Sequence, residues 1–372
     1  MHVDHTACRI LAMNLRIYRT IVLSWTVAWL GPATSHAAEP LLTPSGEPKQ
    51  VMPRSTQHAL SPAEQVKTFT APAGFRVELF AAEPDVVDPV HVAFDADGNV
   101  YVAEMLDYPF VHTEGMFGPF PDGQVRYLQV DEDGNVVKST IFATAIWLPT
   151  SVLPYDGGVL VTAAPDILFL KDTDGDGIAD VRETVLTGFD THQDLYRVNS
   201  LVWGVDGWIY ARGVGNTPIH WGDDPDGEAM STENGNFRFR PRTREFEAVS
   251  GKSGCFGLTT DDWGRFFYPN SSSHLEQIVL PKHYLKRNSY LSVPSLTVNI
   301  SDHGHSAKIY PTKPPPDWRV ERAVSWEEDG EVERYGFEHE NKQDFMTGTS
   351  GGHVYRSRAF PAEYYGNYFV CE

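Results

Sequence analysis

Cysteine is scarce in this sequence of 372 residues, which contains only three. A small fold held together by disulfides is therefore excluded, because such folds are rich in Cys. Basic residues are also few: 30 Lys and Arg stand against 50 Asp and Glu, for a formal net charge of −20. A chain this acidic repels phosphate backbones, so nucleic acid is not expected as a partner.

Long apolar runs are missing as well. The longest, Thr20–Gly31, has 12 residues, whereas a transmembrane helix needs about 20. Arginines precede this run, and the small residues Ser35 and Ala37 follow it around His36. This order is typical of a secretory signal peptide. We predict a signal over residues 1–37, export to the periplasm, cell surface or exterior, and no transmembrane span after cleavage.

Cleavage after Ala37 removes Cys8 and leaves Cys255 and Cys371, and the sequence leaves open whether these two pair. Residues 38–70 are rich in Pro, Ser, Thr, Gln and Lys and are predicted to form a linker or extended arm.

A hairpin motif recurs from residue 71 onward. Each copy has an alternating apolar segment, a Gly turn and an apolar or aromatic segment, which is typical of a β-hairpin. The copies are His91–Met105, Ser151–Pro165, Ser200–Gly213 and Gly257–Asn270. Their turn glycines, Gly98, Gly157, Gly207 and Gly264, lie 59, 50 and 57 residues apart. Repeats of this length with several strands each predict an all-β fold, a β-propeller.

The length of residues 71–372 corresponds to between five and six blades at this spacing. We predict a six-bladed propeller whose last blade is truncated, because a propeller closes its ring to remove free sheet edges. The alternative is that the arm helps to close it. Residues 128–140 read as an outer hairpin of the first blade, and the final "YYGNYFVCE" as a strand of another blade. Residues 311–344 lack strand periodicity and are predicted to form an insertion loop.

The most specific chemical motif is "DTDGDGIADVRE" at residues 172–183. Its spacing matches a twelve-residue calcium loop, in which alternate side chains turn onto one ion and Gly makes the sharp bend. The predicted Ca²⁺ ligands are Asp172, Asp174, Asp176, the Ile178 carbonyl, Asp180 and Glu183. The flanks read as strands rather than EF-hand helices, so we expect a structural Ca²⁺ site within a blade. The alternative is a solvated acidic turn.

Candidate ligand-binding residues lie beside the motif strands, because propellers bind ligands where their loops converge. His192, Arg197 and Asn199 precede the third motif, and Arg212 follows its second strand. His can abstract a hydroxyl proton, and Arg can bind an anionic carboxylate. Further polar candidates are Asn270, His274, His303 and His305, and a possible sugar-stacking wall consists of Trp203, Trp208 and Tyr210. The sequence has no C-x-x-C-H motif, so no haem is attached to this chain by that motif.

These motifs, together with "APAGFRVELFAAEPDVVDPV", "FRFRPRTREFEAVSG" and "YYGNYFVCE", resemble the membrane-bound dehydrogenase family of Planctomycetes and Verrucomicrobia. That family is similar to the glucose/sorbosone dehydrogenases, six-bladed propellers that use pyrroloquinoline quinone (PQQ). The resemblance covers residues 71–372. It implies a small sugar or alcohol substrate, PQQ as cofactor and a cytochrome c-type electron acceptor.

The resemblance also suggests residue roles. The catalytic His of the sugar dehydrogenases precedes the strand that reads "SLVWGVDGWIY" here. Tyr196 stands at that place and the nearest His is His192, four residues earlier. We therefore predict His192 as the base, with Arg197, Asn199 and Arg212 as cofactor or substrate ligands. Two alternatives remain: a lactonase-type hydrolase with Ca²⁺ on Glu104, Asn199 and Asn270, and a non-catalytic propeller that binds a glycan or a partner.

Overall fold

The structure, a computed structural model, describes residues 60–108, 122–191, 197–213, 215–251, 256–270, 273–288, 290–301, 310 and 348–371. Their strands form five antiparallel sheets. Helix in the described residues is limited to α2 (Pro62–Lys67), α3 (Lys282–Leu285) and the 3-10 turns Pro241–Thr243 and Ala362–Tyr364. The all-β prediction is confirmed, and the arrangement is consistent with a propeller-like fold.

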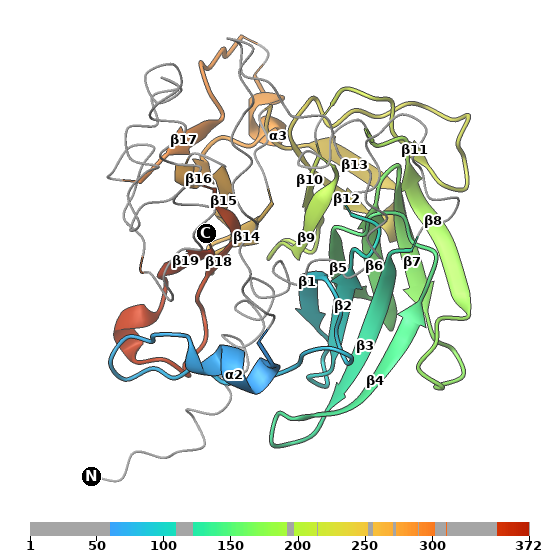
Figure 1. Cartoon of the computed structure of the whole chain (residues 1–372). Coiled ribbons are helices and arrows are strands. Elements are labelled where there is room, and N and C mark those ends of the chain that lie inside the picture. The colour runs from blue at the N-terminus through green and yellow to red at the C-terminus, as the bar shows by residue number, and fades with distance from the viewer. Residues whose placement is uncertain are drawn as a thin grey trace, which may run out of the picture.

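Each sheet is named by its order along the chain (Figure 1). The first contains β1 (Pro89–Phe94), β2 (Val100–Glu104), β3 (Gln124–Val130) and β4 (Val136–Ala143). The second contains β5 (Ser151–Tyr155), β6 (Gly158–Ala163), β7 (Asp166–Lys171) and β8 (Val181–Thr187), with β11 (His220–Trp221) at its edge. The third contains β9 (Asn199–Trp203), β10 (Ile209–Arg212), β12 (Asn236–Arg240) and β13 (Glu245–Ala248).

The fourth sheet contains β14 (Thr259–Thr260), β15 (Phe266–Asn270), β16 (Ser273–Ile278) and β17 (Thr297–Asn299). The last has two strands, β18 (Ser350–Val354) and β19 (Tyr368–Cys371). Strands pair in chain order within each sheet, except that β11 returns to β8 of the preceding sheet. The predicted insertion at 311–344 lies outside the described residues.

The four predicted hairpins are β1–β2, β5–β6, β9–β10 and β14–β15, and the predicted outer hairpin is β3–β4. Their shared glycines all have positive φ, between 72° and 88°, a backbone region that Gly enters without steric cost. In the first turn Asp95 Oδ1 also accepts hydrogen bonds from the Asp97 and Asn99 amides. These local interactions explain why the motif predicts the turns.

The hydrophobic core lies between neighbouring sheets. One cluster joins the first two sheets, a second joins the second and third, and a third joins the third and fourth. The second strands β2 and β6 are buried along their whole length because both of their faces are covered. The first strands of neighbouring sheets contact one another, β1 with β5 and β5 with β9. In Figure 1 the first two sheets accordingly stand side by side.

The segment before β1 packs against the end of the described chain. The Phe75 ring lies 4.9 Å from that of Phe360 and 5.3 Å from that of Tyr364, both at steep angles. Helix α2 was not expected within the arm at 38–70. It forms because Ser61 caps the start of the helix and Glu64, in the first turn, hydrogen-bonds back to Ser61, which together make a capping box. Pro62, the first helical residue, also favours a helix start. No helix in the described part of the chain is long and apolar enough to cross a membrane.

His91, on β1, is expected to make the stability of the protein depend on pH. Its Nδ1 accepts a hydrogen bond from the Val152 amide at 3.3 Å, and burial lowers the pKa of its imidazole from 6.5 to about 4. Below pH 6.5 the unfolded chain binds a proton that the folded chain does not bind until about pH 4. The contribution of His91 to stability is therefore expected to fall as pH falls through this window and to level off below it, and its expected loss at pH 5 relative to pH 8 is about 2 kcal/mol.

Urea denaturation at pH 8 and pH 5 checks this expectation against His91→Asn, whose amide oxygen replaces the Nδ1 acceptor without titrating. The variant is expected to lose less stability than the wild type between these two pH values. An equal loss in both proteins would contradict the role of His91.

Candidate functional site

Buried polar side chains gather at one edge of the sheets. By this edge we mean one end of the strands and not an outermost strand: here the first strand of each sheet begins, the second ends and the third begins. In the third sheet, Asn199, Arg212 and Asn236 therefore lie beside one another. We call this edge the polar face. Its buried members are Glu104, Gln124, Ser151, Thr162, Asn199, Arg212, Asn236 and Ser273. Because buried polar groups must be hydrogen-bonded, their partners indicate what this edge does.

On the third sheet these groups form a chain of hydrogen bonds. Arg197 Nη2 donates to the Thr191 carbonyl at 2.9 Å, and Asn199 Nδ2 donates to the Arg197 carbonyl at 2.7 Å. Ser200 Oγ donates to Asn199 Oδ1 at 2.5 Å and accepts from the Gly257 amide at 2.8 Å. Ser200 has φ of 57°, a conformation uncommon for Ser. This series of hydrogen bonds thus connects Thr191 to Gly257, in the segment that precedes the fourth sheet.

Arg212 joins the third sheet to the fourth. Its Nη1 donates to the carbonyls of Gly257 at 3.0 Å and Pro269 at 3.2 Å, and its guanidinium lies 4.7 Å from the centre of the Tyr268 ring. The side chain is fully buried. The structure thus brings together at the polar face the three residues that the sequence predicts as ligands, Arg197, Asn199 and Arg212. Each of them hydrogen-bonds to main-chain carbonyls of the protein.

Glu104, the predicted ligand of the lactonase alternative, is also engaged. Its carboxylate accepts from the Val87 amide at 2.8 Å, from Gln124 Nε2 at 2.5 Å and from Arg126 Nε at 2.7 Å. Both Glu104 and Arg126 are buried. Sequence reasoning missed this ion pair, although a charged residue inside the apolar pattern of β3 is a signal that could have found it. An Arg-paired carboxylate is a poor candidate for a catalytic Ca²⁺ ligand.

Other predicted residues are placed as follows. The Asn270 carbonyl accepts a hydrogen bond from the Thr349 hydroxyl, which joins the fourth sheet to the segment before β18. His274 lies on β16, in the same sheet. The remaining predicted residues, His192, His303, His305 and Cys255, lie outside the described residues.

The aromatic residues of the third motif separate into two groups. Trp208 and Tyr210 are buried between the third and fourth sheets, where Arg238 lies 4.3 Å from the Trp208 ring centre. Burial raises the pKa of Tyr210 to about 12, so its hydroxyl stays protonated and hydrogen-bonds to Asp206 at 2.9 Å. Trp203, in contrast, is 41% exposed. A wall formed by all three rings is therefore not present.

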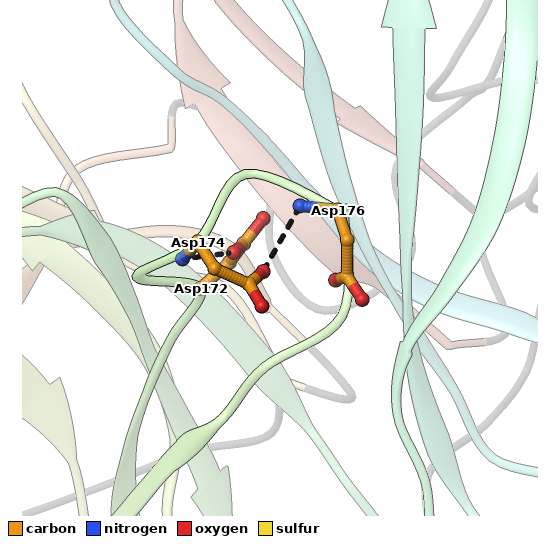
Figure 2. Close-up of side chains that lie close together, drawn as sticks. All are labelled: Asp172, Asp174 and Asp176. Atoms are coloured by element: carbon orange, nitrogen blue, oxygen red, sulfur yellow. Dashed lines mark hydrogen bonds between the residues drawn. The ribbon is translucent and has the colours of Figure 1, made fainter.

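The predicted calcium loop connects β7 to β8, so its flanks are strands as expected. Figure 2 shows that Asp172, Asp174 and Asp176 lie on one tight turn; one carboxylate oxygen from each lies within 4.8 Å of the others. Asp172 accepts hydrogen bonds from the Gly175 and Gly177 amides at 2.7 and 2.8 Å. These bonds lower the pKa of the Asp172 carboxyl, so it carries negative charge at neutral pH.

The remaining predicted ligands are arranged differently. Asp180 Oδ2 accepts from the Thr173 hydroxyl at 2.6 Å, and Glu183 lies within β8 opposite Phe169. Ile178 directs its amide to Asp176 Oδ1 at 2.7 Å. The structure therefore gathers three of the predicted carboxylates. A calcium ion at this turn remains a prediction.

The loop also contacts the first sheet. The Ala179 amide donates to the Phe142 carbonyl on β4 at 2.8 Å, and Arg182 donates to the Thr144 and Ala145 carbonyls at 2.9 and 2.8 Å. An ion bound at residues 172–176 would therefore stiffen a junction between two sheets.

Comparison with curated proteins gave no match. Among solved structures the chain is similar to a luciferin-regenerating enzyme, with 12% identity and a TM-score of 0.33 over 51% of this chain and 54% of that one. It is also similar to the PQQ domain of pyranose dehydrogenase from Coprinopsis cinerea, with 11% identity and a TM-score of 0.31 over 52% and 48%. A third is a Carbohydrate-Active Enzymes Family AA12 protein from Trichoderma reesei, with 12% identity and a TM-score of 0.34 over 57% and 50%.

The chain spans about half the length of each of these solved chains. At the level of sequence, a family model covers nearly all of the described chain. It matches residues 61–372, and its description is "Domain of unknown function (DUF7133)". The chain belongs to this family.

Proposed function

We propose that this chain is an exported, dehydrogenase-like six-bladed β-propeller that oxidises a sugar or another alcohol with PQQ and passes the electrons to a cytochrome c-type acceptor. The observation that carries the proposal is at the polar face, where Arg197 and Asn199 hydrogen-bond the residues that flank the segment containing His192 in the sequence. The motifs that resemble the sugar dehydrogenases support the choice of reaction.

The described residues act on the segment that carries His192 by holding both of its ends. Arg197 binds the Thr191 carbonyl, which precedes the segment, and Asn199 binds the carbonyl of Arg197, which follows it. In the proposed reaction His192 takes the proton of the substrate hydroxyl as general base. Arg197 and Asn199 are then positioning residues, which keep the ends of the base's segment in place.

PQQ would supply the two-electron acceptor for this oxidation. The contacts of Arg197, Asn199 and Arg212 do not fit direct ligation of PQQ, because their side chains are buried and hold carbonyls and a hydroxyl of the protein. Their predicted role as cofactor ligands would require them to exchange these partners.

A titration of the purified protein with PQQ tests the proposal, followed by a screen of sugars and alcohols with an artificial electron acceptor. We expect saturable binding, a raised melting temperature and turnover with at least one substrate. His192→Gln is expected to reduce kcat by about 10²-fold or more, the usual contribution of a general base. His283→Gln, in α3, is the matched control and should keep full activity.

Absence of PQQ binding together with absence of turnover would overturn the proposal. Turnover that survives His192→Gln would retain the dehydrogenase and refute the assigned base.

A further inference from the structure

A pocket of about 470 Å³ lies at the other end of the strands from the polar face. It is formed between the second and third sheets by the ends of their first strands and by the β12–β13 turn. Its lining includes Tyr155, Asp156, Trp203, Arg240, Arg242 and Thr243. Asn199 and Trp203 begin and end β9, so the pocket is separated from the polar face by about 13 Å of strand. The proposed reaction does not use this pocket.

An aromatic wall forms one side of the pocket. The rings of Tyr155 and Trp203 stack with centroids 6.0 Å apart and an interplanar angle of 20°. Trp203 Nε1 donates to the Pro154 carbonyl at 3.2 Å, which holds the indole in place. Since Trp203 remains 41% exposed, a fixed aromatic surface is open to a ligand.

The charged groups around this wall are paired. Arg242 Nη2 lies 2.8 Å from Asp156 Oδ1, and both side chains are more than half exposed. Arg240 contacts Glu245 at 3.4 Å and donates to the Asp206 carbonyl at 2.8 Å. Each guanidinium thus has a carboxylate beside it, so the pocket has no excess of positive charge to bind an anion. It does offer exposed hydrogen-bond donors and acceptors.

These properties together match one class of ligand. A pyranose ring has an apolar face of C–H groups that packs on an aromatic ring, and hydroxyl groups at its edge that donate and accept hydrogen bonds. It carries no charge. An apolar wall with a few polar groups beside it is the usual composition of a small-molecule site. We propose that this pocket binds a residue of a neutral glycan, with Trp203 stacking on the sugar face and Arg242 and Asp156 binding its hydroxyls.

Affinity gel electrophoresis tests the proposal, with gels that contain β-1,3-glucan, hydroxyethylcellulose, xylan, galactomannan or, as the anionic comparison, alginate. We expect at least one neutral polysaccharide to retard the wild type. Trp203→Ala and Arg242→Ala should each weaken that binding by about tenfold, which corresponds to about 1.4 kcal/mol. Trp203→Phe keeps an aromatic face and should retain most of the affinity.

Trp263→Ala is the matched control, because Trp263 is 74% exposed and is not among the residues that line the pocket. Arg242 is mostly exposed, so Arg242→Ala still tests the site if Trp203→Ala fails to fold. The proposal is overturned if no neutral polysaccharide retards the wild type, if only alginate does, or if both alanine variants bind as the wild type does. These gels contain no PQQ and no electron acceptor, so their result does not depend on the proposed oxidation.

Discussion

Arg126→Met is expected to lower the free energy of unfolding by about 3–5 kcal/mol, the usual cost when one partner of a buried ion pair is removed. The reason is the carboxylate that stays behind. Glu104 is fully buried, and Arg126 Nε lies 2.7 Å from its Oε1. Without the guanidinium the charge keeps only the Val87 amide and the Gln124 amide group as partners.

Two further variants separate this effect from a loss of packing. Glu104→Gln combined with Arg126→Met removes the buried charge, so the double variant should recover much of the lost stability. Arg242→Met breaks the exposed pair with Asp156 and should cost less than about 1 kcal/mol. Urea denaturation measures all of these proteins. Equal losses in Arg126→Met and Arg242→Met would refute the importance of burial.

Calcium is expected to raise the melting temperature of the wild type and to leave that of the double variant Asp172→Asn, Asp176→Asn almost unchanged. A ligand that binds only the folded protein adds about 2.7 kcal/mol at a concentration of one hundred times its Kd. The acidic turn contacts β4 through the Ala179 amide, so the stabilisation should extend to the junction of the first and second sheets.

Calorimetry with Ca²⁺, with Mg²⁺ and with a chelator checks this expectation. Mg²⁺ should have a smaller effect, because it demands near-octahedral geometry and gives up its waters reluctantly. Asp97→Asn removes an exposed carboxylate from a turn without such a cluster, and this control should respond to Ca²⁺ as the wild type does. A shift of equal size in the double variant would place the effect elsewhere and leave the turn as a solvated acidic loop.

The sequence predicted those parts of the fold that depend on neighbours along the chain. The Gly turns and their apolar flanks predicted the four hairpins correctly, because the positive φ that a turn requires at Gly98 or Gly207 depends only on residues next to one another in the chain. The strands on either side of the acidic loop were also predicted correctly. The capping box at Ser61 was present in the sequence but was overlooked within a segment interpreted as a linker.

The candidate site could be predicted only in part. The proximity of Arg197, Asn199 and Arg212 follows from strand order, and the structure does bring them together. The hydrogen-bond partners of Arg212 could not be predicted from the sequence, since the carbonyls of Gly257 and Pro269 belong to the fourth sheet and its preceding segment.

By itself, then, the sequence determined the all-β class, the hairpins and the spacing of the acidic loop, because each arises from residues within about a dozen positions of one another. Only the tertiary structure decided which polar groups meet across sheets. It pairs Glu104 with Arg126 and directs Arg212 to carbonyls of the neighbouring sheet. It also buries Trp208 and leaves Trp203 exposed beside Tyr155. Such contacts join residues distant in the chain, and their geometry is set by how the sheets pack.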